Sequence, residues 1–339
     1  MPAINAIAII GAGAWGTALA KHLAEKGFAV RLWAYEHDVV SAINASHENP
    51  VFLKGVTLPR SLTATHSLVE AVTGCEGIVF AVPSHATRSV LHKMAPALPG
   101  SIPLVCATKG IEEHTTKLMT EVMEDELPPS MHRSFMVLSG PSFASEFSAG
   151  RPTAVCLAGT DGELVRRFQG ALMTPAFRVY ADTDMIGVQL GGALKNVMAL
   201  AAGVIDGLEL GLNARAALIT RGLAETIRLG IAMGADPRTF YGLSGVGDLV
   251  LTCTGALSRN HSVGVRLGRG ETLETILAGM QAVAEGVRTA RAAFALARRY
   301  QVDMPITQEI NAVLYDDKSC RKAVSDLMER DAKPEKEWA

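Results

Sequence analysis

Residues 6–16 read Ala-Ile-Ala-Ile-Ile-Gly-Ala-Gly-Ala-Trp-Gly, and this stretch decides the fold of the first half of the chain. The apolar run at its start predicts a buried strand, and a helical pattern follows at once. Between them, Gly11 permits a tight turn, Gly13 lets a pyrophosphate approach the backbone, and Gly16 lets the helix pack against the strand. The helix N-terminus then directs unpaired N–H groups at the phosphates. The stretch therefore predicts a dinucleotide site, and the alternative is a glycine-rich turn without a ligand.

Apolar runs and helical stretches alternate from this point to about residue 183. Several of the runs are continuous, which is typical of strands buried on both faces of a parallel sheet. After that point strand-like runs almost vanish and helical spacing dominates. We therefore predict a Rossmann-like, doubly wound α/β domain over 1–183, an all-helical domain over 184–330 and a frayed tail over 331–339. The predicted strands are 6–10, 29–34, 77–82, 103–107, 135–138, 153–158 and 177–181.

Composition places the chain among globular proteins with no general attraction for polyanions. It has 339 residues, 48% of them hydrophobic, and a formal net charge of −2. Such a balance predicts no nucleic-acid partner and no anionic membrane partner. The five cysteines form no C-x-x-C pair, and no signal peptide, membrane-spanning segment or metal-ligand set is expected. We expect a cytoplasmic protein.

Polar residues follow three predicted strands, at the end of an α/β sheet where ligands bind. Glu36 stands 20 residues after Gly16, where a carboxylate grips ribose hydroxyls and favours NAD; the alternative is a solvated loop carboxylate. Lys109 follows another strand, where it can meet a phosphate or polarise a carbonyl; otherwise it is a surface lysine. Residues 139–144 offer backbone N–H groups and a hydroxyl, or form a plain turn.

Lys195 is the most unusual residue of the helical half, because it lies among Gly, Ala, Leu and Val over 191–203. Burying an ammonium group is costly, so such a lysine is paired or has a depressed pKa, and it can exchange a proton. The alternative is a lysine that extends out of the helix to solvent. Asp248, in the bend Gly-Val-Gly-Asp, is predicted to face Lys195; its alternative role is a helix N-cap.

Two further helix starts carry groups suited to ligands. Ser258, Arg259 and Asn260 present a hydroxyl, a guanidinium and an amide, which suit the oxygens of a phosphate; the alternative is an ordinary capped helix start. Glu285 opens a later helix and is predicted to reach the nicotinamide side of the site.

Six segments together resemble one family, the bacterial type of NAD(P)-dependent glycerol-3-phosphate dehydrogenase. They stand in the family's order and span most of the chain. The segments are Gly-Ala-Gly-Ala-Trp-Gly-Thr-Ala (11–18), Thr-Lys-Gly (108–110), Ser-Gly-Pro-Ser-Phe-Ala (139–144), Ala-Leu-Lys-Asn (193–196), Gly-Val-Gly-Asp-Leu (245–249) and Ser-Arg-Asn (258–260).

The resemblance implies an activity and a role for each matching residue. It implies that NAD(P)H transfers hydride between dihydroxyacetone phosphate and sn-glycerol 3-phosphate, for phospholipid synthesis, in a homodimer. Lys195 is then the general acid/base. The residues implied to hold the substrate are Lys109, Gly140, Ser142, Lys195, Asp248, Ser258, Arg259 and Asn260. Those implied for the dinucleotide are Gly11, Gly13, Ala14, Trp15, Gly16, Tyr35, Glu36, Lys109, Ala144, Arg259, Val283 and Glu285.

Two other functions fit parts of the sequence. One is a dehydrogenase with a helical second domain that acts on a β-hydroxy acid or on ketopantoate; a phosphate-binding role for residues 258–260 disfavours it. The other is a nucleotide-sensing protein without turnover, and Lys195 disfavours that because a sensor needs no proton donor. At Tyr35 and Glu36 the chain departs from relatives that carry basic residues there, which favours NAD over NADP.

Overall fold

The computed structural model describes residues 4–280, 284–332 and 334–335. The chain separates into two compact units: unit 1 comprises Met1–Lys109 and Lys117–Met185, and unit 2 comprises Gly110–Thr116 and Ile186–Ala339. The sequence placed the division near residue 183 and assigned 110–116 to the first half. In the structure this short segment instead groups with the helical unit, where Arg291 and Arg288 form ion pairs with Glu113.

Unit 1 is built on a sheet of eight strands in the order β10-β9-β8-β7-β6-β1-β2-β5. The glycine-rich turn follows β1, and β1 separates β2 and β5 on one side from the strands that come later in the chain on the other. This is the switch point at which open α/β sheets bind ligands. The strands are β1 (Ala6–Ile10), β2 (Ala29–Trp33), β5 (Thr63–Thr65), β6 (Gly77–Phe80), β7 (Leu104–Cys106), β8 (Phe135–Ser139), β9 (Thr153–Gly159) and β10 (Phe177–Asp182).

The sheet departs from the predicted strands in two ways. The predicted parallel sheet is present, but one edge departs from it, because β9 pairs with β8 antiparallel and carries β10 with it in the reversed direction. The short strands β5, β3 (Glu48–Asn49) and β4 (Leu53–Thr57) were not predicted, and the last two form a separate antiparallel pair. With two and three residues, β3 and β5 are too short for a recognisable period in the sequence.

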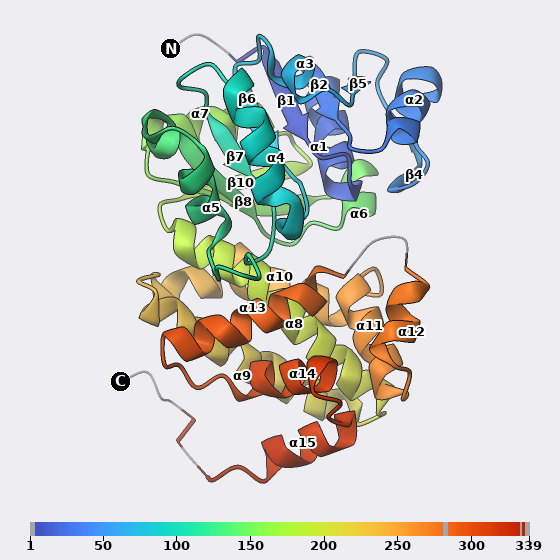
Figure 1. Ribbon diagram of the computed structural model, residues 1–339, viewed down its shortest axis with the longest axis vertical. Coiled ribbons are helices and arrows are strands. Elements are labelled where there is room, and N and C mark those ends of the chain that lie inside the picture. Colours follow the sequence, from blue (N-terminus) through green and yellow to red (C-terminus); the bar gives the residue numbers. More distant parts are fainter. Residues whose placement is uncertain (1–3, 281–283, 333, 336–339) are drawn as a thin grey trace. The chain divides into compact units, whose positions relative to one another are not determined.

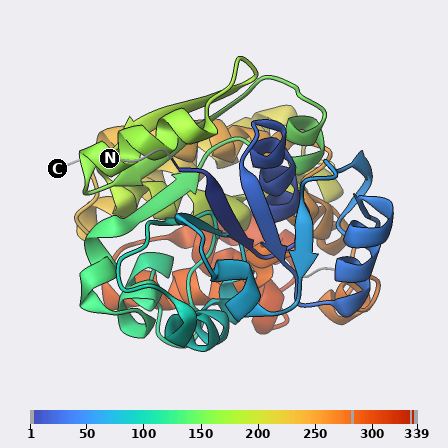
Figure 2. The ribbon, with the colours of Figure 1, turned by 90° about the horizontal axis from the view of Figure 1, so that it is seen from above.

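Alternate residues of β1 enter cores on opposite faces of the sheet. Ile7 and Ile9 pack with the apolar sides of α1 and α7, whereas Ala8 and Ile10 pack with those of α3, α4 and α5. Figure 2 shows α1 and α7 on one side of the strands and the α4–α5 side on the other. The helices are α1 (Ala14–Glu25), α2 (His37–Ser46), α3 (Leu68–Val72), α4 (Thr87–Met94), α5 (Met119–Glu126), α6 (Ala144–Ser148) and α7 (Gly162–Leu172).

Unit 2 is helical and is organised around α8 (Figure 1). Among the described residues, α8 is the one helix long and apolar enough to cross a membrane, but 94% of its most apolar window is buried within the protein, as in the core helix of a globular domain. The helices are α8 (Met185–Gly207), α9 (Gly211–Ala232), α10 (Asp248–Thr254), α11 (Arg259–Gly268), α12 (Leu273–Ala278), α13 (Glu285–Arg299), α14 (Pro305–Tyr315) and α15 (Cys320–Met328), with a 3-10 turn η4 (Pro237–Tyr241) and a π-helical turn η5 (Leu243–Gly247).

Glycines bring the backbones of the helical unit into direct contact with α8. A Cβ at Gly203 of α8 would lie 2.1 Å from the carbonyl oxygen of His261, and a Cβ at Gly264 of α11 would lie 2.1 Å from that of Leu200. Nearer the start of α8, a Cβ at Gly191 would lie 2.3 Å from the carbonyl oxygen of a residue in η5. Because η5 leads into α10, these contacts fix the segments around Asp248 and Arg259 against the helix that carries Lys195.

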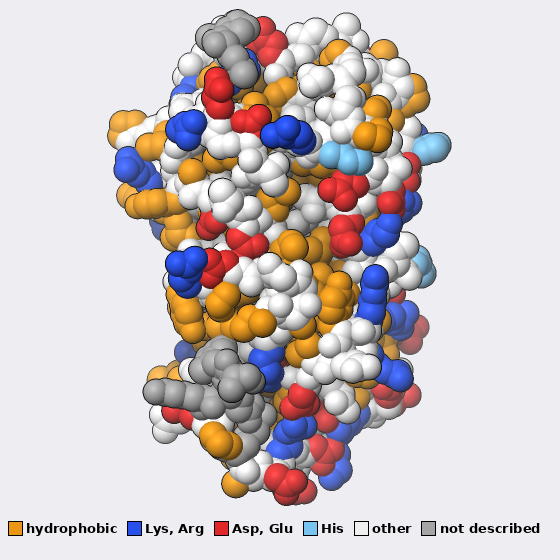
Figure 3. Space-filling view, turned by 90° about the vertical axis from the view of Figure 1, so that its left-hand side faces the viewer, with side chains coloured by type: hydrophobic (Ala, Val, Ile, Leu, Met, Phe, Trp, Pro, Cys, Tyr) orange, Lys and Arg blue, Asp and Glu red, His pale blue; other side chains and the backbone are white. Residues whose placement is uncertain are grey.

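The surface carries charges of both signs. Figure 3 shows Lys and Arg side chains interspersed with Asp and Glu on the face drawn there, with no extended patch of one sign among the described residues. This pattern agrees with the formal net charge of −2. An anionic ligand must therefore be held by a local arrangement of donors.

Candidate functional site

The three glycines of the turn after β1 have the backbone geometry that their predicted roles require. Gly11 has a φ of +115°, and a Cβ there would lie 2.6 Å from the carbonyl oxygen of Ala81. A Cβ at Gly16 would lie 1.9 Å from the carbonyl oxygen of Gly11, so only glycine allows α1 to pack this closely. A Cβ at Gly13 would meet nothing within 4 Å. The backbone at Gly13 is therefore open on the side where a ligand can approach.

Two side chains that sequence reasoning did not single out hold this turn. The carbonyl oxygen of Ala12 accepts hydrogen bonds from Thr17 Oγ1 at 3.1 Å and from Asn49 Nδ2 at 2.8 Å. Asn49 also donates to Thr17 Oγ1 at 2.9 Å and is fully buried. Because Asn49 lies in β3, far along the chain in an undistinguished polar stretch, no local signal marks it.

The other residues of unit 1 that the sequence assigned to the dinucleotide differ in burial and in their position on the helices. The indole Nε1 of Trp15, in the first turn of α1, is buried and has no hydrogen-bond partner among the described residues. Tyr35 is 76% exposed, and Glu36 is the exposed N-cap residue of α2, with no side-chain cap hydrogen bond. Ala14 and Ala144 are the first residues of α1 and α6.

Lys109, Gly140 and Ser142 meet at the ends of β7 and β8. The carbonyl oxygen of Gly140 accepts hydrogen bonds from Lys109 Nζ and from Ser142 Oγ, each at 2.9 Å. Gly140 has a φ of +143°, and a Cβ there would lie 2.9 Å from the Cα of Val155. Lys109 is therefore not a solvated surface lysine, because its amine ties the loop after β7 to the loop after β8.

Lys195 and Asp248 are in contact within unit 2. Lys195 Nζ donates to Asp248 Oδ1 at 2.5 Å; Lys195 is 9% exposed and Asp248 is fully buried. Thr252 Oγ1, one turn further along α10, lies 3.3 Å from the same carboxylate oxygen. Asp248 is the first residue of α10 and Gly247 is the N-cap, so the alternative role as an N-cap does not apply. An ion pair this deeply buried fixes the direction of the lysine side chain.

Asn260 joins three segments of unit 2. Its Nδ2 donates to Asn196 Oδ1 at 2.9 Å, and its Oδ1 accepts from the backbone N–H of Gly286 at 2.9 Å. Asn196 follows Lys195 directly and was not singled out from the sequence. The amide therefore ties the start of α11 to α8 and to the first turn of α13, so part of its hydrogen-bonding capacity is used within the protein.

Ser258 and Arg259 differ in how accessible their side chains are to a ligand. Ser258 is buried and its Oγ accepts from His261 N at 3.2 Å, which makes it the N-cap of α11, the alternative left open from the sequence. Arg259 is exposed at the first position of this helix. Glu285 is the first residue of α13, and Val283 lies outside the described residues. Arg259 is thus the exposed cation among the three residues, 258–260, that the sequence predicted to hold a phosphate.

The thiol of Cys253, in the same helix as Asp248, is not available as a nucleophile. Cys253 in α10 is fully buried, and burial raises its pKa to about 12. A thiol with this pKa stays protonated at neutral pH. Cys253 is therefore not a candidate for proton transfer in unit 2.

Comparison with known proteins agrees with the motifs. The model of the NAD-dependent glycerol-3-phosphate dehydrogenase N-terminus matches residues 6–165, and that of the C-terminus matches 184–325. The glycerol-3-phosphate dehydrogenase [NAD(P)+] of Geobacter sulfurreducens is 54% identical over 97% of this chain and 98% of its own length. The solved structure of glycerol-3-phosphate dehydrogenase from Coxiella burnetii has a TM-score of 0.93 at 41% identity, covering 97% of this chain and 100% of that one.

A more distant structure bears on the alternative dehydrogenase. A ketopantoate reductase of the PanE/ApbA family from Ralstonia eutropha has a TM-score of 0.60 at 17% identity, covering 96% of this chain and 100% of that one. This similarity shows a shared fold alone. The resemblance inferred from the six sequence segments is confirmed. The chain belongs to the family of NAD-dependent glycerol-3-phosphate dehydrogenases.

Proposed function

We propose that the protein interconverts dihydroxyacetone phosphate and sn-glycerol 3-phosphate with NAD(P)H, and so supplies the glycerol backbone of phospholipids. The observation that carries this proposal is the buried contact between Lys195 Nζ and Asp248 Oδ1 at 2.5 Å, in a member of this dehydrogenase family. A charged amine held in one direction by a buried carboxylate is suited to donate a proton to a ketone oxygen and to recover it in the reverse direction.

Unit 1 fits a dinucleotide. Three observations at the N-terminus of α1 support this: the open side of Gly13, the positive φ of Gly11, and a buried indole N–H of Trp15 that has no acceptor among the described residues. The bound dinucleotide supplies a hydride from its nicotinamide. Lys109, through the carbonyl of Gly140, fixes the loop that leads to Ala144. The other residues proposed to line the dinucleotide are Gly16, Tyr35, Glu36, Arg259, Val283 and Glu285.

Unit 2 supplies the proposed proton donor and the proposed phosphate contact. As charge grows on the substrate oxygen during reduction, Lys195 donates its proton there, and Asp248 keeps the amine oriented. We propose that Arg259, together with the start of α11, binds the phosphate, so that binding energy remote from the carbonyl positions the reacting carbon. The remaining proposed substrate contacts are made by Gly140, Ser142, Ser258 and Asn260. Each contacts the substrate directly or fixes the backbone beside it.

The decisive assay follows NADH or NADPH absorbance with dihydroxyacetone phosphate and, separately, with ketopantoate. We expect turnover with dihydroxyacetone phosphate only, and a higher kcat/KM with NADH than with NADPH, because Glu36 repels a 2′-phosphate. Turnover of ketopantoate alone would identify the alternative dehydrogenase. Binding of the dinucleotide without turnover of either substrate would identify a sensor. A strong preference for NADPH would contradict the assigned role of Glu36 and leave the reaction in place.

Arg259→Ala is expected to raise the KM for dihydroxyacetone phosphate by about 10²-fold, with a smaller change in kcat. The exposed guanidinium is proposed to make charge-assisted hydrogen bonds to the phosphate, and their loss weakens substrate binding. Steady-state kinetics at saturating NADH measure the change. Arg269→Ala is the matched control, because Arg269 is exposed at the opposite end of the same helix. An unchanged KM in the Arg259 variant would remove this residue from the phosphate site.

We further propose that the protein is a cytoplasmic homodimer with two functional domains divided near residue 183. The four cysteines with buried side chains and the fifth at the start of α15 are free thiols, which supports a reducing compartment. Leu210, the N-cap residue of α9, and Leu212, in its first turn, are 40% and 71% exposed and offer an apolar surface to a second copy. Light scattering of the full chain measures the oligomeric state.

A further inference from the structure

An aromatic layer joins α1 to α6 in unit 1. The ring centroids of Trp15 and Phe147 lie 5.0 Å apart with an interplanar angle of 58°. Phe147 also contacts Phe177 at 4.6 Å and His22 at 5.1 Å. We call these four residues the ring cluster. Phe147 is 6% exposed and Phe177 is 1% exposed, so the cluster is a packed element of the core and its rings are restrained by their neighbours.

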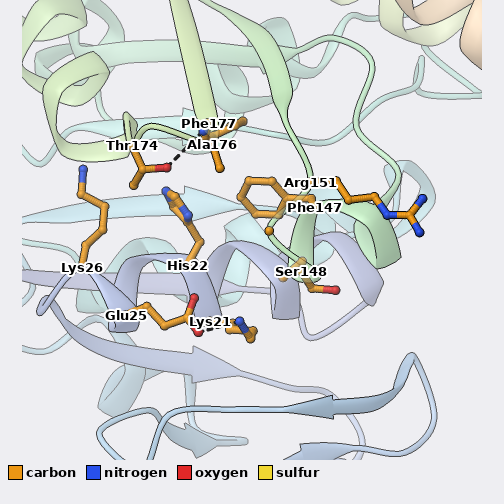
Figure 4. A pocket seen from close by; sticks show the side chains of 12 residues that line it. Lys21, His22, Glu25, Lys26, Phe147, Ser148, Arg151, Thr174, Ala176 and Phe177 are labelled. Carbon is orange, nitrogen blue, oxygen red and sulfur yellow. Dashed lines mark hydrogen bonds and ion pairs between the residues drawn. The ribbon is translucent and has the colours of Figure 1, made fainter.

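The polar side chains beside the ring cluster have a structural role. They line a cleft of about 220 Å³ (Figure 4). His22 Nε2 lies 2.6 Å from the carbonyl oxygen of Leu172, and Lys26 Nζ donates to that of Met173 at 2.5 Å. These carbonyls belong to the end of α7, so His22 and Lys26 satisfy the acceptors that a helix C-terminus leaves unpaired. These hydrogen bonds account for His22 and Lys26 without a ligand, and His22 anchors the ring cluster to α7.

The contact between Trp15 and Phe147 links two sequence motifs. Trp15 stands inside the glycine-rich turn motif, and Phe147 lies three residues after Ala144, which ends the motif over 139–144 and begins α6. Both motifs are assigned to the cofactor in the proposed function. The buried indole Nε1 of Trp15 has no acceptor among the described residues. A buried donor without a partner is costly, and a ligand that supplies an acceptor removes the cost.

We propose that Phe147 is a positioning residue for the dinucleotide: it holds the Trp15 indole so that its N–H is available to an acceptor on the bound cofactor. This inference rests on the proposed dinucleotide site of unit 1. Phe147 itself has no role in hydride or proton transfer. Its effect is exerted through Trp15, whose orientation is set in advance, so that less conformational freedom is lost when the cofactor binds.

Phe147→Leu tests the proposal, because leucine keeps an apolar side chain but removes the ring that contacts Trp15. We expect the Kd for NADH, measured by calorimetry without substrate, to rise about tenfold, the equivalent of ~1.4 kcal/mol. The KM for NADH should rise in parallel, with the main effect on KM and not on kcat. Phe177→Leu is the matched control. Phe177 contacts Phe147 and His22 in the same cluster, and no ring contact with Trp15 is observed among the described residues. It should lower thermal stability and leave the Kd for NADH unchanged.

Further variants separate this proposal from the cofactor site itself. In the background Trp15→Phe, which lacks the indole N–H, Phe147→Leu should raise the Kd much less than it does in the native chain. An unchanged Kd in Phe147→Leu, or an equal rise in the Phe177→Leu control, would overturn the positioning role. Gly13→Val tests the site independently, because a Cβ there meets nothing in the protein. If Gly13→Val leaves the Kd for NADH unchanged, the proposed dinucleotide site is wrong, whatever Phe147 does.

Discussion

Lys195→Ala is expected to reduce kcat for dihydroxyacetone phosphate by about 10³-fold or more, since positioned general acids contribute on the order of 10²–10⁴-fold and the charge near the developing alkoxide is lost as well. The Kd for NADH should be close to that of the native chain, because the residues proposed to bind the glycine-turn side of the cofactor belong to unit 1. Single-turnover kinetics with NADH bound beforehand measure the chemical step directly, and calorimetry measures the Kd.

The same substitution also leaves the buried Asp248 carboxylate without its lysine. Breaking a buried ion pair by removing one partner costs about 3–5 kcal/mol, so part of any lost activity could reflect an unstable protein. The double variant Lys195→Met with Asp248→Asn resolves this, because it removes both charges while preserving side-chain volume. It should be more stable than Lys195→Ala in thermal unfolding and remain as inactive. Near-normal turnover in either variant would show that the proton comes from another group.

Local sequence patterns predicted the parts of the site that depend on backbone geometry. Gly11 and Gly16 were identified because a tight turn and close helix packing each require the absence of a side chain, and the structure shows both constraints. Lys195 stood out because a single ammonium in an apolar helix demands a partner. Asp248, 53 residues away, was named as that partner because it stands in the unusual bend Gly-Val-Gly-Asp. The structure places the two side chains in contact.

The elements that the sequence did not reveal depend on contacts between distant residues. Asn49 holds the carbonyl of Ala12 across 37 positions, and Asn196 pairs with Asn260 across 64. A lone asparagine carries no period or motif, so its partner cannot be inferred from neighbours in the chain. The reversed direction of β9 was missed for a related reason: the apolar pattern of a buried strand is the same whether it runs parallel or antiparallel.

Gly264→Ala is expected to have the second largest effect, this time on the framework of unit 2. The new Cβ would lie 2.1 Å from the carbonyl oxygen of Leu200, which is backbone of α8 and cannot move aside as a side chain would. The helices must therefore separate, and overpacking of this kind costs about 1–3 kcal/mol or more. The substitution also favours helix formation by up to ~1 kcal/mol, which works against the loss. We expect a net decrease in the free energy of unfolding, measured by denaturant titration.

Separation of α8 and α11 should also reduce activity, because the first turn of α11 carries Arg259 and Asn260. A misplacement of about 1 Å can cost on the order of 10²-fold in rate. Gly170→Ala is the matched control. It makes the same chemical change inside α7, where a Cβ meets nothing within 4 Å, so it should stabilise the protein and leave kinetics unaltered.

The crossing of α8 and α11 also allows a test with a second glycine. Gly203 of α8 faces the same crossing, where its Cβ would lie 2.8 Å from the Cα of Gly264. Once Gly264→Ala has pushed the helices apart, Gly203→Ala should add less than it costs alone, so the two losses of stability are not additive. Additive losses, or a Gly264→Ala variant as stable and active as the native chain, would mean that the close approach of α8 and α11 does not determine where Arg259 and Asn260 lie relative to Lys195.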